Sequence, residues 1–284
     1  MCSNRVLLRV VKDFRRAMDL SLVLDQEGIS HDLRSAGPEQ WALSIDEADA
    51  VRAEAAVASF ERENPLPPPR RIVEKPIPSS AVACGLVFFL SLLAMHVWTG
   101  PDSSASIWFT RGSADARAIL QGDWWRTVTA LTLHGDAGHA VGNAVLGGLL
   151  LTLLARALGA GVGSAVLLLS GALGTLAAAA LVRRDFVSIG ASTAVFGALG
   201  ALSALPQHRR RAWIPLGAGL ALLAFLGTGK RADLAGHSCG FAAGVALGSL
   251  VSLLPPLRSR AAQATLALAA ALVPAIAWVA AFRG

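Results

Sequence analysis

The sequence predicts an all-α polytopic membrane protein with seven transmembrane helices, preceded by a small soluble α+β domain. Of the 284 residues, 54% are hydrophobic and only 15% are charged, whereas soluble domains carry about 25% charged residues. After residue 80, apolar runs recur that are long enough to cross a bilayer core of roughly 30 Å as helices. The first 64 residues contain no such run and have a mixed, soluble composition.

Residues 1–64 are expected to form the soluble domain, with the element order β-α-β-β-α. Strands are expected over residues 5–11, 29–33 and 41–44, and helices over residues 14–27 and 46–62. Gly28 ends the first helix, and Ser44 or Asp46 is expected to cap the second, which has acidic residues in its first turn. This order fits a sheet with two helices on one face. A regulatory or docking role and a plain cytosolic cap both stay open, because the domain holds no catalytic cluster.

Residues 65–79 are expected to be a linker, and residues 80–284 the membrane domain. The linker is rich in proline, which holds a chain extended. The seven spans are expected at residues 80–98, 128–154, 162–182, 189–205, 213–228, 234–254 and 262–281. Basic residues divide almost equally between the two sides of these spans, so their distribution does not fix the orientation.

The net charge of +6 raises nucleic acid as an alternative partner. Most basic residues lie in short loops between spans, where Lys and Arg commonly flank membrane helices, so no nucleic-acid partner is expected. The cysteines, Cys2, Cys84 and Cys239, are scattered, and we expect reduced thiols rather than a disulfide. Their spacing is not that of a metal site, and neither a metal nor another cofactor is expected.

A serine and a histidine lie at matching depths in two of the predicted spans. Ser192 lies in the first turn of span four and His237 in the first turns of span six. Both spans begin on the same side of the membrane because each is even-numbered. A general base must come within about 3 Å of a hydroxyl to take its proton, and this placement allows it.

Polar residues at the start of span two lie at the same level. His139 and Asn143 are four residues apart and share a helix face, so both side chains are suitable donors to a developing oxyanion. Span six carries glycine at every fourth residue, at Gly236, Gly240, Gly244 and Gly248. Such a face lets two helices approach closely.

Other interpretations of the polar residues stay open at this point. His134, His139 and His237 could bind zinc, with Asp136 or Asp233 as a further ligand, although the five-residue spacing of the first two does not stack on a helix. The pair in span two could form an interhelical hydrogen bond without chemistry. A transporter or channel would carry its polar residues nearer the bilayer midplane.

Four strings occur in order between about residues 120 and 250. They are Trp125-Arg126, His-Ala-Val-Gly-Asn at 139–143, Gly-Ala-Ser-Thr-Ala-Val-Phe-Gly at 190–197, and Gly-His-Ser-Cys-Gly-Phe-Ala-Ala-Gly at 236–244. Together they resemble the rhomboid family of intramembrane serine proteases. The span after the six-helix core resembles the form of that family with an added C-terminal helix.

The resemblance implies a serine endopeptidase that cleaves transmembrane segments of membrane proteins. It implies Ser192 as nucleophile, His237 as general base, and His139 and Asn143, with the Ser192 N–H, as the oxyanion hole. Phe196 would pack on the catalytic imidazole. The resemblance also implies a multi-pass protein among the lipids of the plasma (inner) membrane, with a cytosolic N terminus and an active site toward the extracytoplasmic face.

Two features qualify the resemblance. Thr193 stands where the family often has glycine, so its side chain is expected to crowd span six. Asp233 precedes His237 by four residues, but we expect it to cap span six and therefore predict a Ser–His dyad rather than a triad. The alternatives are a catalytically inactive relative that binds transmembrane helices and, less favoured, a transporter.

Overall fold

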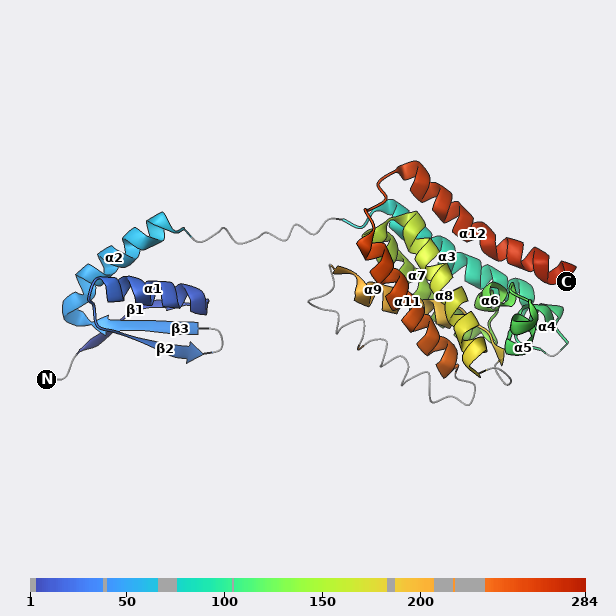
Figure 1. Cartoon of the computed structure of the whole chain (residues 1–284), viewed down its shortest axis with the longest axis horizontal. Coiled ribbons are helices and arrows are strands. Elements are labelled where there is room, and N and C mark those ends of the chain that lie inside the picture. Colours follow the sequence, from blue (N-terminus) through green and yellow to red (C-terminus); the bar gives the residue numbers. More distant parts are fainter. Residues whose placement is uncertain are drawn as a thin grey trace. The chain divides into compact units, whose positions relative to one another are not determined.

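The computed structural model describes residues 4–37, 40–65, 76–103, 105–182, 187–206, 217 and 233–284. The chain divides into two compact units, Met1–Glu74 and Lys75–Gly284 (Figure 1). Apart from residue 217, the span expected at residues 213–228 lies outside the described residues.

The N-terminal unit is a three-stranded antiparallel sheet with two helices. Its elements are β1 (Arg5–Val11), α1 (Phe14–Gln26), β2 (His31–Gly37), β3 (Gln40–Asp46), the short 3-10 helix η1 (Glu47–Asp49) and α2 (Ala50–Glu63). The strand order is β1-β3-β2, and the core includes Leu20, Leu24, Leu43, Ile45 and Val57. The predicted element order is confirmed, but β2 begins two residues later than expected and ends four residues later.

The described residues of the second unit are almost entirely helical. Its elements are α3 (Ser79–Thr99), α4 (Ile107–Gly112), β4 (Ala114–Asp115), α5 (Ala116–Gln121), α6 (Arg126–Thr129), η2 (Ala130–Thr132), α7 (Ala137–Leu158), α8 (Ala160–Val182), β5 (Val187–Ser188), α9 (Ser192–Ala204), α11 (Leu234–Leu253) and α12 (Arg260–Arg283). Within the described residues, five helices are long and apolar enough to cross a membrane: α3, α7, α8, α11 and α12. The chain is therefore a multi-pass integral membrane protein, in which α9 is a shorter apolar helix.

The prediction that span two begins near residue 128 is wrong. Residues 126–132 form the separate short helices α6 and η2, and the backbone at Leu133 is extended. The membrane helix α7 begins only at Ala137, where Asp136 caps it by accepting a hydrogen bond from the His139 N–H. His134 therefore precedes the helix instead of lying within it.

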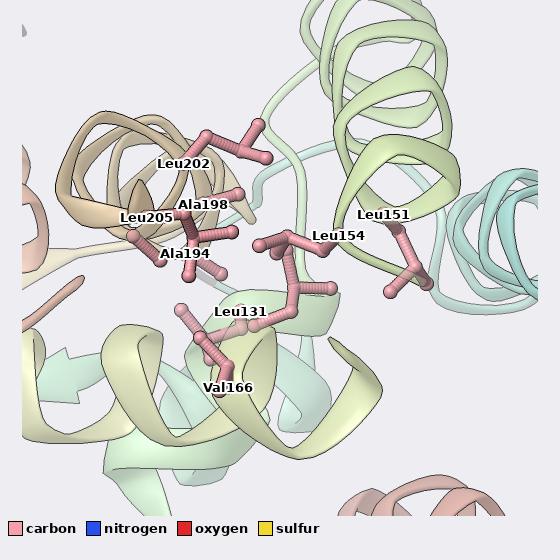
Figure 2. Packing of buried hydrophobic residues seen from close by; sticks show 10 residues of the cluster. Leu131, Leu151, Leu154, Val166, Ala194, Ala198, Leu202 and Leu205 are labelled. Carbon is pink, nitrogen blue, oxygen red and sulfur yellow. The ribbon is translucent and has the colours of Figure 1, made fainter. Parts of the chain in front are cut away.

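The helix α9 occupies the centre of the membrane unit. Every residue from Ser192 to Leu202 is buried, and α9 packs against α7, α8 and α11. Figure 2 shows side chains of η2, α7 and α8 meeting those of α9, among them Leu131, Leu154, Val166 and Ala194. A helix built from small apolar residues can be covered on all sides in this way, which fixes the position of its first residue.

The glycines of α11 bring its backbone against that of α9. A β-carbon at Gly240, Gly244 or Gly248 would collide with a backbone carbonyl oxygen of α9, at Thr193, Gly197 and Ala201 respectively. The predicted close approach through a four-residue repeat is thus confirmed for three of the four glycines. The fourth, Gly236, lies against the side chain of Asp233 instead.

The C-terminal helix α12 is held near its two ends. At its start, the Gln263 side-chain oxygen accepts a hydrogen bond from the Gly161 N–H at 2.7 Å, and its amide nitrogen donates to the Leu158 carbonyl at 3.0 Å. One side chain thereby caps the end of α7 and the beginning of α8. Toward the other end, Trp278 donates a hydrogen bond to the Thr132 hydroxyl at 3.1 Å.

Candidate active site

The structure brings the two residues of the predicted dyad into contact. Ser192 is the first residue of α9, and His237 lies in the first turn of α11. The His237 Nε2 atom lies 2.8 Å from the Ser192 hydroxyl oxygen. His237 is only 5% exposed and Ser192 only 8% exposed. When the hydroxyl donates this hydrogen bond, the imidazole nitrogen is in position to accept the serine proton.

An aromatic ring fixes the plane of the imidazole. Phe196 lies one turn after Ser192 on α9 and is fully buried. Its ring stacks on that of His237 with centroids 4.5 Å apart and an angle of 25° between the planes. This is the packing that the resemblance implies, and it restricts the histidine to rotamers that face the serine.

The carboxylate nearest to His237 in sequence is engaged elsewhere. One oxygen of Asp233 accepts a hydrogen bond from the Gly236 N–H at 2.6 Å, so Asp233 caps α11 as expected. The other accepts from the Ser188 hydroxyl at 2.5 Å. The Nδ1 atom of His237 is buried and has no hydrogen-bond partner among the described residues. The geometry is therefore that of a pair rather than a triad.

The two predicted oxyanion donors meet above a single glycine. A β-carbon at Gly190 would lie 2.7 Å from the His139 imidazole and 3.6 Å from the Asn143 amide nitrogen. Gly190 has a φ of 114°, which favours glycine, and the missing side chain leaves this space to the two donors. The Asn143 amide also donates to the His139 carbonyl at 3.1 Å, which holds it on the same side of α7.

The segment that leads into Ser192 is tethered at successive residues. Ser188 in β5 pairs with Ala114 in β4. The Gly190 N–H donates to the carbonyl of Ala130 at 2.8 Å. The Ala191 N–H donates to the Nε2 atom of His134 at 3.3 Å. The serine is therefore positioned by the turn before it as well as by its own helix.

Thr193 is accommodated by glycines on two neighbouring helices. It is 3% exposed, and its methyl group lies 2.9 Å from where a β-carbon of Gly174 or Gly240 would stand. Glycine on both α8 and α11 thus provides the room that the threonine needs. The expected crowding of span six is relieved at these two positions.

The zinc alternative finds no set of donors in the described part of the chain. No group of three or more His, Cys, Asp or Glu side chains there is placed to hold a metal ion. The rings of His134 and His139 lie 5.1 Å apart. However, the Nε2 atoms of His134 and His237 face the Ala191 amide and the Ser192 hydroxyl instead.

The fold and the site define a class: a multi-pass helical membrane protein with a buried Ser–His pair beside clustered polar donors. Residues 121–254 match the family model described as the Rhomboid domain. The chain thus contains a region similar to the Rhomboid domain, and this region makes up just under half of its length. The matched region contains the serine, the histidine and both donors.

Two relatives from Bacillus subtilis (strain 168) carry the family name. The chain is 28% identical to rhomboid protease GluP over 165 residues, which are 56% of this chain and 31% of that protein. It is 29% identical to the putative rhomboid protease YdcA over 118 residues, which are 40% of this chain and 59% of the relative. The chain thus spans less than two thirds of the length of either relative.

Proposed function

We propose that this protein is an intramembrane serine endopeptidase that cleaves transmembrane segments of membrane proteins with a Ser192–His237 dyad. The observation that carries the proposal is the 2.8 Å contact between the serine hydroxyl and the imidazole at the buried starts of two helices. An ionisable residue in a membrane helix is expensive and usually functional. The names of the two relatives support the same activity.

The first half of the reaction forms an acyl-enzyme. His237 Nε2 takes the Ser192 proton, and the serine oxygen forms a bond to the scissile carbonyl carbon. The resulting oxyanion accepts hydrogen bonds from His139, Asn143 and the Ser192 N–H. The beginning of α9 favours this negative charge, because N–H groups in the first turn lack intrahelical partners. Collapse of the intermediate breaks the peptide bond, and the leaving amine takes the proton from His237.

The second half repeats these steps with water. His237 removes a proton from water, and the water oxygen forms a bond to the acyl carbon. Collapse then breaks the bond to the serine oxygen, which recovers its proton from the histidine. Loss of one oxyanion donor typically costs about 10²–10³ in rate, so His139→Ala and Asn143→Ala are expected to be impaired but not silent.

The family resemblance supports a location for this chemistry. We propose the plasma (inner) membrane, a cytosolic N terminus and an active site toward the extracytoplasmic face. The partners are then membrane-protein substrates, cut near the outer surface, and the surrounding lipids. Tagging each terminus and testing its access to protease in sealed membrane vesicles measures the orientation.

Cleavage of a generic transmembrane reporter tests the function. Wild type, Ser192→Ala and His237→Ala are compared in one detergent, with equal folding verified by thermal unfolding. We expect cleavage by the wild type and loss of at least about a hundredfold in each variant, as for removal of a general base. A wild type that binds the reporter without cutting it would instead indicate the inactive, helix-binding relative.

A further inference from the structure

We propose that His134 is a positioning residue of the active site: it accepts the Ala191 amide proton and so fixes the turn that presents Ser192. The catalytic part of this inference rests on the proposed function. His134 itself touches neither the serine nor the dyad histidine through a hydrogen bond given by the structure. It acts through the backbone immediately before the nucleophile.

The contact is buried on both sides. His134 is 0% exposed and Ala191 1% exposed, and the Ala191 nitrogen lies 3.3 Å from His134 Nε2. Ala191 is the N-cap residue of α9, where backbone N–H groups have no acceptor within the helix. A buried N–H without a partner costs about 1–3 kcal/mol. The imidazole therefore satisfies a donor that the start of α9 would otherwise leave unpaired.

The contact requires one protonation state of the histidine. Only a neutral ring with its proton on Nδ1 can accept at Nε2. Burial, followed by the nearby His139, lowers the pKa of His134 to about 3, so the ring is neutral at ordinary pH. Its Nδ1 atom is buried without a hydrogen-bond partner among the described residues.

The same ring also lies against a proposed oxyanion donor. The rings of His134 and His139 meet edge to face at 5.1 Å. The turn at residues 190–191 is thus docked on the segment before α7 by two hydrogen bonds, to the Ala130 carbonyl and to the His134 ring. Removing the second bond frees the residue adjacent to Ser192, while the first still holds Gly190.

Two variants distinguish the hydrogen-bond acceptor of the His134 side chain from the volume that this side chain fills. His134→Leu fills much of the ring's space but cannot accept a hydrogen bond, whereas His134→Gln can place an oxygen near the position of Nε2. We expect the leucine variant to lose about 10–10²-fold in kcat with little change in KM, as misplacement by about 1 Å can do. The glutamine variant should recover most of the loss. His96→Leu is the matched control, because His96 also has a buried, unpartnered Nδ1 among the described residues.

The readout does not depend on catalysis alone. Amide hydrogen exchange of the peptide that contains Ala191 should become faster in His134→Leu and stay near the wild-type rate in His134→Gln and His96→Leu. Labelling of Ser192 by a fluorophosphonate should become slower in His134→Leu and stay near the wild-type rate in His134→Gln and His96→Leu.

Unchanged exchange in His134→Leu, or a folded His134→Gln as defective as His134→Leu in both assays, would overturn the inference. If His134→Leu does not fold, the comparison of His134→Gln with the wild type still decides it. A wild type that is never labelled, with exchange as expected, would remove the proposed function and with it the catalytic role of His134. The contact itself would then stand.

Discussion

Two helix contacts in the membrane unit differ sharply in how they are built. The helices α9 and α11 meet backbone to backbone, because glycines on α11 face carbonyl oxygens on α9. The helix α12, by contrast, is held near its ends and leaves an apolar cavity of about 750 Å³ between it, α3 and α8. Ala270 and Pro274 of α12 line this cavity.

The difference indicates where the molecule can accommodate an added group. Ser192 and His237 lie on α9 and α11, whose backbones are in direct contact. Their 2.8 Å separation is therefore set by backbone positions that cannot shift without a collision. Interiors packed this closely respond to a single added methyl group. The side of α12 can absorb such a group, since a cavity already lies there.

The largest effect is expected at the centre of the glycine contact. In Gly244→Ala, the new β-carbon would collide with the carbonyl oxygen of Gly197 and push α11 away from α9. We expect about 1–3 kcal/mol of destabilisation and a loss of reporter cleavage of at least about tenfold, since displacement of reacting groups by about 1 Å costs as much as 10²-fold.

The control is a glycine on α7. At Gly142, a β-carbon would meet nothing within 4 Å, and alanine there should leave both stability and cleavage near wild type. Thermal unfolding and initial cleavage rates measure the two effects. If Gly142→Ala and Gly244→Ala had equal unfolding temperatures and equal cleavage rates, the close contact of α9 and α11 would not determine the geometry of Ser192 and His237.

A smaller effect, on stability alone, is expected where α12 is attached. Gln263→Ala removes the acceptor for the Gly161 N–H and the donor to the Leu158 carbonyl. Leaving these partly buried groups unpaired should cost about 1–3 kcal/mol, measured as a lower unfolding temperature. Cleavage per folded molecule should be unchanged, because the attachment is remote from Ser192. A tenfold drop in that specific rate would show that α12 controls the site.

Asp233→Asn should have a still smaller effect. The asparagine can keep the cap of α11, so we expect a cost of less than about 1 kcal/mol and cleavage within a few-fold of wild type. The carboxylate is already bonded to the Gly236 N–H and the Ser188 hydroxyl. Near-total loss of cleavage with intact folding would instead indicate a triad that includes Asp233.

The smallest effect is expected for a side chain added to the cavity. Ala270→Leu places apolar atoms in existing space and should change the free energy of unfolding by less than about 1 kcal/mol, without loss of cleavage. Ala269, the adjacent exposed residue, provides the control Ala269→Leu. If Ala270→Leu lost as much stability and cleavage as Gly244→Ala, the α9–α11 contact and the packing of α12 would not differ as described.

Much of this arrangement could be predicted from the sequence, because membrane helices follow from length and hydropathy alone. Because spans two, four and six begin on the same side of the membrane, the sequence predicts that Ser192, His237, His139 and Asn143 lie at one depth. The glycine repeat of span six predicts a close contact between two helices. The start of α7 could not be predicted in this way, since the residues just before it, 126–132, are helical too. The signal was Asp136, which caps α7 and ends the preceding segment.

The part of the site that sequence reasoning missed depends on tertiary contacts. The sequence offers His134 only as a possible metal ligand, because its five-residue spacing from His139 does not place the two on one helix face. Its partner is a backbone amide 57 residues away, and no local pattern reveals such a contact. The accommodation of Thr193 by Gly174 likewise depends on how α8 and α9 pack.

The most direct test is mass-spectrometric mapping of a fluorophosphonate adduct on the detergent-solubilised protein. The dyad predicts an adduct on Ser192 in the wild type, and a labelling rate at least about a hundredfold lower in a folded His237→Ala variant. A wild type without an adduct on Ser192, or undiminished labelling in the absence of the His237 imidazole, would contradict it.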